Sequence, residues 1–148
     1  MTDVDLMREA LAEARAAAAG GEVPIGAVAV LNGQIVARGQ NRVLRDCDPT
    51  AHAEVVAMRA AALAVNNYRL IECELYVTLE PCSMCAGAMM HARLGRLIYA
   101  AADPRAGAAG SVLDVLNHPR LNHQMAVTAG ILADESAELL RAFFRERR

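Results

Sequence analysis

The sequence contains no lysine and no tryptophan, and its aromatic residues are limited to three Tyr and two Phe. Hydrophobic residues nevertheless make up 55% of the 148 residues and charged residues 22%, a balance that excludes a disordered chain. All 15 basic residues are arginines. A GC-rich genome explains this bias, although Arg also suits contacts with phosphate groups. At this length we expect a single domain over residues 1–148, with a core of ordinary size.

The chain also lacks a long apolar run and an export signal. No apolar run approaches the roughly 18–20 residues that span a bilayer. The acidic start, Met1–Asp5, does not show the basic and then apolar order of a signal peptide. We therefore expect a cytoplasmic protein with no membrane partner, whose four cysteines stay reduced and can bind a metal.

A strong charge of one sign is absent as well, since the formal net charge is −2 at pH 7. This value excludes a nucleic-acid-binding protein that is basic throughout. The charge is unevenly distributed, because residues 141–148 contain four Arg and one Glu. The sequence therefore predicts a basic helix end beside an acidic remainder.

Hydrophobic periodicity predicts an initial helix and hairpin, followed by strands that alternate with helices. Asn32-Gly33 is a strong hairpin signal, because both turn positions favour positive φ. Asp48-Pro49 predicts a helix start, with Asp as the cap and Pro at the first helical position. The expected strands are 25–31, 34–41, 74–79, 97–101 and 125–128, and the expected helices are about 6–18, 48–66, 82–92 and 134–148. This order predicts an α/β protein, a three-layer α/β/α fold with a central five-stranded mixed sheet.

Two short strings, His52-Ala53-Glu54 and Pro81-Cys82-Ser83-Met84-Cys85, contain three side chains that can bind a metal. Structural zinc sites usually have four protein ligands, whereas catalytic sites have three and leave a position for water. His52, Cys82 and Cys85 form such a three-ligand set, and one imidazole with two thiolates suits zinc. Both strings are expected at a helix start, where free N–H groups favour thiolates.

Glu54 is then available for proton transfer. Two thiolates make the ion less electrophilic, so the water should need help to lose its proton, and a carboxylate near His52 can give it. Two other interpretations remain open. Cys47 would close a structural site as a fourth ligand, or Cys82 and Cys85 would act as a redox pair. Both alternatives leave Glu54 without a role.

His-x-Glu followed by Pro-Cys-x-x-Cys is the signature of the zinc deaminases. Further matching segments extend over nearly the whole chain, at residues 22–28, 48–54, 76–82, 84–89, 107–111, 118–119, 122–123 and 143–145. In these segments the chain resembles the bacterial tRNA-specific adenosine deaminases, a family of the cytidine/deoxycytidylate deaminase superfamily. The later segments favour this family over other members of the superfamily.

The resemblance implies a cytidine deaminase-like fold and a cytoplasmic homodimer with one Zn²⁺ per subunit. The implied reaction is the hydrolysis of adenosine to inosine at the wobble position of an arginine tRNA, with release of ammonia. The partner is then the tRNA anticodon stem-loop, whose unpaired bases an enzyme acting on a base edge requires. By the same likeness His52, Cys82 and Cys85 hold the zinc ion, and Glu54 carries protons.

The resemblance also assigns contacts with the substrate outside the metal site. The residues implied are Asn41, Ala53, Asp103, Asn122, Phe144 and Arg145. Phe143 and Phe144 are adjacent, so they cannot both face the core of a surface helix. We therefore expect one exposed ring, which can stack on an unpaired base.

The metal site alone does not select the base, because it would serve adenine, guanine or cytosine equally. A small-molecule guanine or cytosine-nucleotide deaminase is therefore the alternative enzyme. A zinc-stabilised RNA-binding module is the alternative without catalysis. Formation of inosine from an anticodon stem-loop would distinguish among the three.

Overall fold

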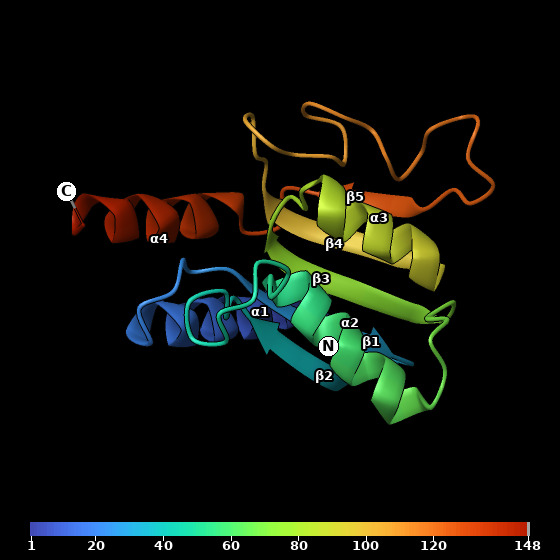
Figure 1. Cartoon of the computed structure of the whole chain (residues 1–148), viewed down its shortest axis with the longest axis horizontal. Coiled ribbons are helices and arrows are strands. Elements are labelled where there is room, and N and C mark those ends of the chain that lie inside the picture. The colour runs from blue at the N-terminus through green and yellow to red at the C-terminus, as the bar shows by residue number, and fades with distance from the viewer. Residues whose placement is uncertain (148) are drawn as a thin grey trace.

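A mixed sheet of five strands forms the middle layer of the molecule (Figure 1). The computed structural model describes residues 1–147. The strands lie in the order β2-β1-β3-β4-β5, where β1 is antiparallel to β2 and β3, and β4 and β5 run parallel to β3. Their bounds are β1 Gly26–Leu31, β2 Gln34–Gln40, β3 Cys73–Leu79, β4 Arg96–Ala101 and β5 Ala126–Ala129.

Helices cover both faces of this sheet (Figure 1). Their bounds are α1 Asp3–Ala19, α2 Ala53–Val65, α3 Ser83–Ala92 and α4 Ala133–Arg145. Val28 and Val30 of β1 belong to the core beneath α1, whereas Ala27 and Ala29 belong to the core beneath α2 and α3. Because side chains of a strand alternate between faces, one strand contributes to both cores. The expected three-layer α/β/α fold with a five-stranded mixed sheet is confirmed.

The turn between β1 and β2 has the predicted form. Asn32 and Gly33 have φ angles of 52° and 76°, which are the positive values that a tight hairpin turn requires.

The start of α2 differs from the prediction. The helix begins at Ala53, not at Asp48-Pro49. The Asp48 carboxylate instead accepts hydrogen bonds from the amide and the hydroxyl of Thr50, each 2.8 Å long. This local turn competes with the helix, and its consequence is that His52 becomes the N-cap residue of α2.

The last helix, α4, ends at Arg145, so it is shorter than the predicted 134–148. Residue 148 of that prediction lies outside the described residues. Within residues 1–147, no helix combines the length and the apolar composition needed to cross a membrane.

Candidate active site

The starts of α2 and α3 carry the candidate metal ligands. His52 is the N-cap residue of α2 and Cys82 is the N-cap residue of α3. Neither side chain caps its own helix, so both are free to turn toward a common point. Cys85 follows in the first turn of α3 and is buried.

The ligand atoms of His52, Cys82 and Cys85 all lie within 4.8 Å of one another. Nδ1 of His52 is 3.6 Å from the sulfur of Cys82 and 3.4 Å from the sulfur of Cys85. A tetrahedral zinc ion, with Zn–S bonds of about 2.3 Å and Zn–N bonds of about 2.0 Å, holds a sulfur and a nitrogen about 3.5 Å apart. The three residues therefore fit a zinc ion.

Cys47 does not belong to this group of ligand atoms among the described residues. Its side chain is exposed, and its thiol donates to the carbonyl of Leu44 at 3.8 Å. The geometry therefore gives no support to a closed four-ligand site that includes Cys47.

Hydrogen bonds within the group shift the pKa values of its two thiols in opposite directions. The contact with Cys85, followed by that with His52, lowers the pKa of Cys82 to about 3. The same contact with Cys82, together with burial, raises the pKa of Cys85. The Cys82 thiolate in turn raises the pKa of His52. A divalent cation would replace these protons, because thiolates and neutral imidazole are the forms that bind metals.

Glu54 lies in the first turn of α2 and is 4% exposed. Burial raises the pKa of its carboxyl group, and the opposing contacts, among them the charge of His52, do not offset this effect. A carboxyl group with a raised pKa is suited to general acid–base chemistry near neutral pH.

Ala53 directly follows the candidate ligand His52, and a backbone hydrogen bond joins the segment after Asn41 to the segment before His52. Asn41 directly follows β2 and is 6% exposed, and Ala53 is the first, buried residue of α2. The amide of Arg42 donates to the carbonyl of Ala51 at 2.9 Å. This bond places the residue after Asn41 beside the residue before His52.

Asp103 and Phe144 share a pocket of about 460 Å³ between the loop after β4 and α4. Phe144 is 50% exposed whereas Phe143 is buried, which confirms the expectation of one exposed ring. Arg145 lines an adjoining pocket and pairs with Glu138 at 2.9 Å. Asn122 is exposed on the loop between β4 and β5, and it does not line either pocket.

Glu80, directly before Pro81-Cys82, is a functional candidate that the sequence analysis missed. It is buried, and its carboxylate accepts from the amides of Asp103, Ala109 and Ser111 at 3.0–3.1 Å, and from the Ser111 hydroxyl. Burial alone would raise its pKa, but these hydrogen bonds hold the pKa below its ordinary value. Glu80 therefore connects the loop after β4 to the string that carries Cys82.

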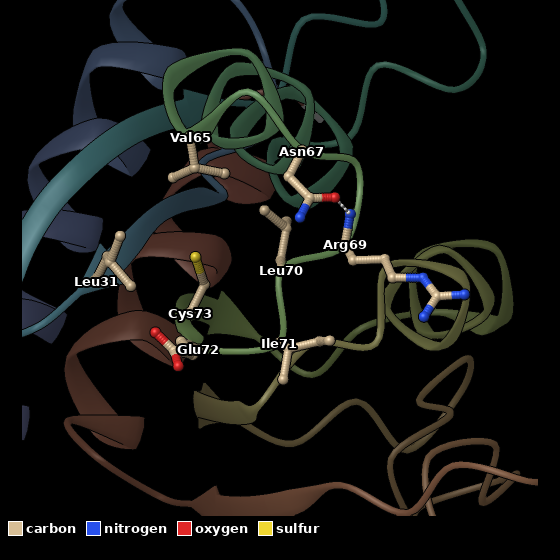
Figure 2. Close-up of a pocket in the computed structure, with 8 residues that line it drawn as sticks. All are labelled: Leu31, Val65, Asn67, Arg69, Leu70, Ile71, Glu72 and Cys73. Carbon is tan, nitrogen blue, oxygen red and sulfur yellow. Dashed lines mark hydrogen bonds between the residues drawn. The ribbon is translucent and has the colours of Figure 1, made fainter.

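A further pocket, of about 310 Å³, lies at the start of β3, the end of the strand away from Cys82 (Figure 2). It is lined by the start of β3, the end of β1 and the segment after α2, and it includes Cys73. None of the candidate metal ligands or substrate residues lines it. This pocket is therefore separate from the candidate metal site.

Known proteins are similar to this chain in both sequence and fold. A family model described as MafB19-like deaminase matches residues 1–148. The tRNA-specific adenosine deaminase of Haemophilus influenzae is 46% identical over 147 residues, which cover 99% of this chain and 85% of that protein.

Solved structures give the same result. One, from studies of A-to-I editing by tRNA:A34 deaminases at the wobble position of transfer RNA, is 47% identical with a TM-score of 0.89 and covers 92% of this chain and 99% of that chain. The guanine deaminase of Nitrosomonas europaea is 28% identical with a TM-score of 0.79, and the match covers 95% of this chain and 83% of that one. The higher identity and TM-score belong to the tRNA deaminase. The resemblance inferred from the motifs is thus confirmed, and this chain belongs to the family of tRNA-specific adenosine deaminases.

Proposed function

We propose that the chain is a zinc-dependent hydrolytic deaminase that converts adenosine to inosine at the wobble position of an arginine tRNA anticodon. The observation that carries this proposal is the group of three candidate ligands, His52, Cys82 and Cys85, beside a buried carboxyl group. That carboxyl group belongs to Glu54, in the first turn of α2, whose N-cap residue is His52. Three protein ligands are typical of catalytic rather than structural zinc. The choice of base and of tRNA is supported by the family.

His52, Cys82 and Cys85 would hold one zinc ion per subunit, which would supply a Lewis acid that makes water nucleophilic at neutral pH. Glu54 accepts a proton from the attacking water and gives it to the ring nitrogen of adenine. Glu54 then takes the second proton, from the new hydroxyl group on carbon 6, and gives it to the leaving amine. Carbon 6 gains the water oxygen and loses its amino group, so one water is consumed and one ammonia is released.

We assign the predicted substrate residues to two groups, one for the base and one for the flanking nucleotides. We place Asn41 and Ala53 against the base, because Ala53 directly follows His52 and the hydrogen bond from Arg42 to Ala51 joins the segment after Asn41 to the segment before His52. Asp103, Asn122, Phe144 and Arg145 contact the flanking nucleotides. The exposed ring of Phe144 suits stacking on an unpaired base, which is worth about 1–3 kcal/mol per base.

A homodimer in the cytoplasm is part of the proposal. An apolar groove of about 540 Å³ between α2 and α3 supports it, with Val55, Met58, Ala62 and Ala88 in its lining. A second copy of this chain would cover these side chains. Light scattering should then give twice the 15.8 kDa of one chain, and a mass of one chain at micromolar concentration would contradict the dimer.

Incubation with an anticodon stem-loop that carries a wobble adenosine tests the activity. We expect inosine, detected by mass spectrometry of the digested RNA, and little product from a fully paired version of the same RNA, because the base must leave the duplex. Equal activity on the paired RNA would contradict this mode of access.

Guanine deamination is the second candidate, and the structural match to the Nitrosomonas europaea guanine deaminase favours it. The same enzyme preparation is therefore given free guanine. Conversion of guanine without any inosine from the stem-loop would replace the tRNA proposal by this one. Zinc binding with no product from either substrate would favour an RNA-binding module.

A further inference from the structure

The backbone of Asn41 is held from both sides. Its amide donates to the carbonyl of Ile25 at 3.1 Å, and its carbonyl accepts from Nη2 of Arg45 at 2.9 Å. Its side-chain oxygen accepts from the amide of Val43 at 3.4 Å. The orientation of the Asn41 side chain therefore depends on the position of the loop that follows it.

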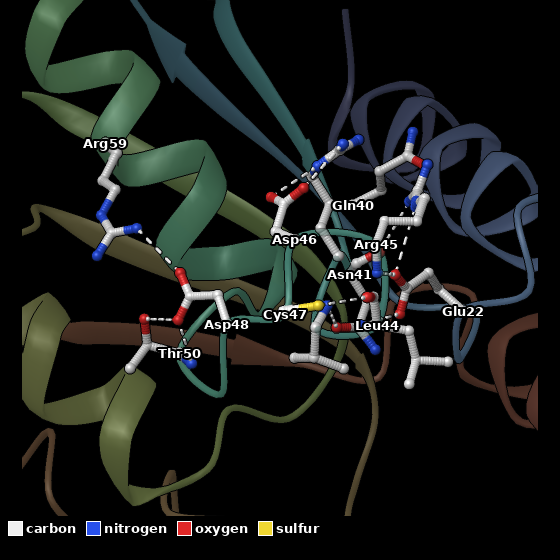
Figure 3. Close-up of polar contacts among 12 residues, drawn as sticks. Glu22, Gln40, Asn41, Leu44, Arg45, Asp46, Cys47, Asp48, Thr50 and Arg59 are labelled. Carbon is white, nitrogen blue, oxygen red and sulfur yellow. Dashed lines mark hydrogen bonds and ion pairs between the residues drawn. The ribbon is translucent and has the colours of Figure 1, made fainter.

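Arg45 contacts three residues through one guanidinium group and so joins the end of β2 to the segment between α1 and β1 (Figure 3). Besides the carbonyl of Asn41, Nη2 reaches the side-chain oxygen of Gln40 at 2.7 Å, and Nε donates to Glu22 at 3.3 Å. The planar group offers several donors in fixed directions, which a lysine could not reproduce. Arg45 is thus the direct link between Glu22 and the residue that we place against the base.

Glu22 fixes the other end of this link. It lies between α1 and β1, it is fully buried, and its carboxylate also accepts from the amides of Leu44 at 3.2 Å and Arg45 at 2.8 Å. Burial alone would raise the pKa of this carboxyl group, but the hydrogen bonds from Arg45 and Leu44 lower it. A charged Glu22 therefore attaches the loop after β2 to the rigid start of the sheet.

We propose that Arg45, held by Glu22, is a positioning residue that sets the orientation of Asn41 toward the substrate base. The proposal rests on the proposed function, because it needs Asn41 at the base. Arg45 and Asn41 share a direct hydrogen bond, so a loss of Arg45 moves the backbone that carries the Asn41 side chain. A misplacement of about 1 Å in a group that orients the substrate can lower the rate about 100-fold.

Arg45→Ala tests this role, because the Arg45 side chain is partly exposed and its removal leaves the core intact. We expect kcat on the stem-loop to fall about tenfold or more while KM changes little. Arg45→Lys keeps one charged donor and should recover part of kcat. If Arg45 instead contacts an RNA phosphate, KM rises and its salt dependence weakens while kcat is retained, and this outcome would overturn the proposal.

A double-mutant cycle with Asn41→Ala separates positioning from a general structural effect. If Arg45 acts through Asn41, Arg45→Ala causes no further loss of kcat in the Asn41→Ala enzyme. An equal loss in both backgrounds would contradict the proposal. Glu22→Gln should lower kcat in the same direction, and the Arg45 variants remain decisive if that buried variant does not fold.

Arg38→Ala is the matched control. Arg38 lies on β2, pairs with Glu9 of α1 at 3.2 Å and is partly exposed, so its removal deletes an arginine and its ion pair on the strand before this loop without touching Asn41. We expect wild-type kcat. An inactive wild-type enzyme would reject the proposed function, whereas an active wild type with an unchanged kcat in Arg45→Ala would reject only the positioning role.

Discussion

At the scale of single residues, three buried glutamates differ in the direction in which their surroundings shift the pKa of the carboxyl group. Glu22 and Glu80 each accept hydrogen bonds from backbone amides, and these bonds lower the pKa although burial opposes them. In Glu54 burial prevails and the pKa is raised. Environments that separate the pKa values of like groups often separate their roles. Glu54 is accordingly the one suited to exchange protons, and the other two are suited to hold loops.

Glu54→Gln should lower turnover by at least about 10²-fold, because the amide keeps the shape of the side chain but cannot carry a proton. Zinc content and thermal stability should stay at their wild-type values. Single-turnover formation of inosine and atomic absorption measure the two quantities. Unchanged turnover would remove Glu54 from the mechanism.

Cys47→Ser and Cys85→Ser form a matched pair, since each replaces one sulfur by oxygen. Cys47 is exposed and outside the ligand group, so its variant should keep one zinc ion per chain and full activity. Cys85 belongs to the group, so its variant should lose zinc affinity. Loss of zinc in Cys47→Ser would instead support the structural site in which Cys47 is the fourth ligand.

At the scale of helices and strands, two glycines set how closely helices approach the sheet. A Cβ at Gly39 in β2 would collide with the backbone of Ala53 and Ala57 in α2, and one at Gly26 in β1 would collide with the backbone of Ala10 and Ala14 in α1. Only α2 carries His52 and Glu54 at its start. The position of the site therefore depends on a residue of β2 that has no side chain.

Gly39→Ala should reduce the free energy of unfolding by about 1–3 kcal/mol, the usual effect of overpacking. It should also weaken zinc binding in the folded protein, because α2 must move. Gly26→Ala is the control: we expect a similar destabilisation but a normal zinc affinity, since α1 carries no candidate ligand. Urea unfolding and competition with a zinc chelator measure the two effects. Equal zinc affinities in both variants would contradict this prediction.

Helix α4 is attached by its buried side while its other side stays available. Ser136 donates to the carbonyl of Thr78 in β3, and Phe143 is buried. The neighbouring Phe144, Arg141 and Arg145 line a surface pocket. Deleting residues 141–148 would remove a core residue together with the charges, so substitution is the cleaner test of RNA binding.

Arg141→Ala with Arg145→Ala should flatten the dependence of RNA affinity on salt. Each lost contact with a single-stranded phosphate should reduce the slope of log K against log [salt] by about 0.7. Fluorescence anisotropy with a labelled stem-loop at several salt concentrations measures this slope. An unchanged slope would count against this face of α4 as part of the RNA site.

At the scale of the whole molecule, Arg96 links the first helix to the sheet. Its guanidinium donates to Asp3 of α1 at 2.7 Å, to Glu74 of β3 at 2.7 Å and to Thr128 of β5 at 3.0 Å. The hydroxyl of Tyr76 donates to the same Asp3 carboxylate at 2.7 Å. The network contains none of the candidate metal ligands and joins α1 to three adjacent strands, so we assign it to stability rather than to chemistry.

Asp3→Asn should reveal this contribution through its pH dependence. The hydrogen bond from Arg96, and then that from Tyr76, lower the pKa of Asp3 below its ordinary value of 3.8. A lowered pKa stabilises the folded state above about pH 4, and this stabilisation is lost as the pH falls through the folded-state pKa. The difference in unfolding free energy between wild type and Asp3→Asn should therefore be larger at pH 6 than at pH 3. A difference that does not change with pH would exclude the charge of Asp3 as its cause.

The two strings around His52 and Cys82, the hairpin at Asn32-Gly33 and the alternation of strands and helices were local patterns, and each was readable from residues a few positions apart. The start of α2 was misread at Asp48-Pro49, because the Asp48 side chain hydrogen-bonds to Thr50 instead of capping a helix. An Asp before Pro is equally compatible with a local turn and with the cap of a helix. In this chain the turn forms, and α2 begins at Ala53.

The sequence was sufficient for the fold class, the family and the three residues of the candidate metal group, because each depends on residue types at short, fixed spacings or on likeness along the chain. Glu54 as the proton carrier stays a prediction. The roles of Glu22 and Glu80 came from the tertiary structure. Glu22 bonds to the amide of a residue 22 positions away, and Glu80 to one 31 positions away. The sequence does not distinguish a carboxylate that folding buries from one left in solvent, and only the packing of the sheet and its loops makes these two glutamates anchors for the loops after β2 and β4.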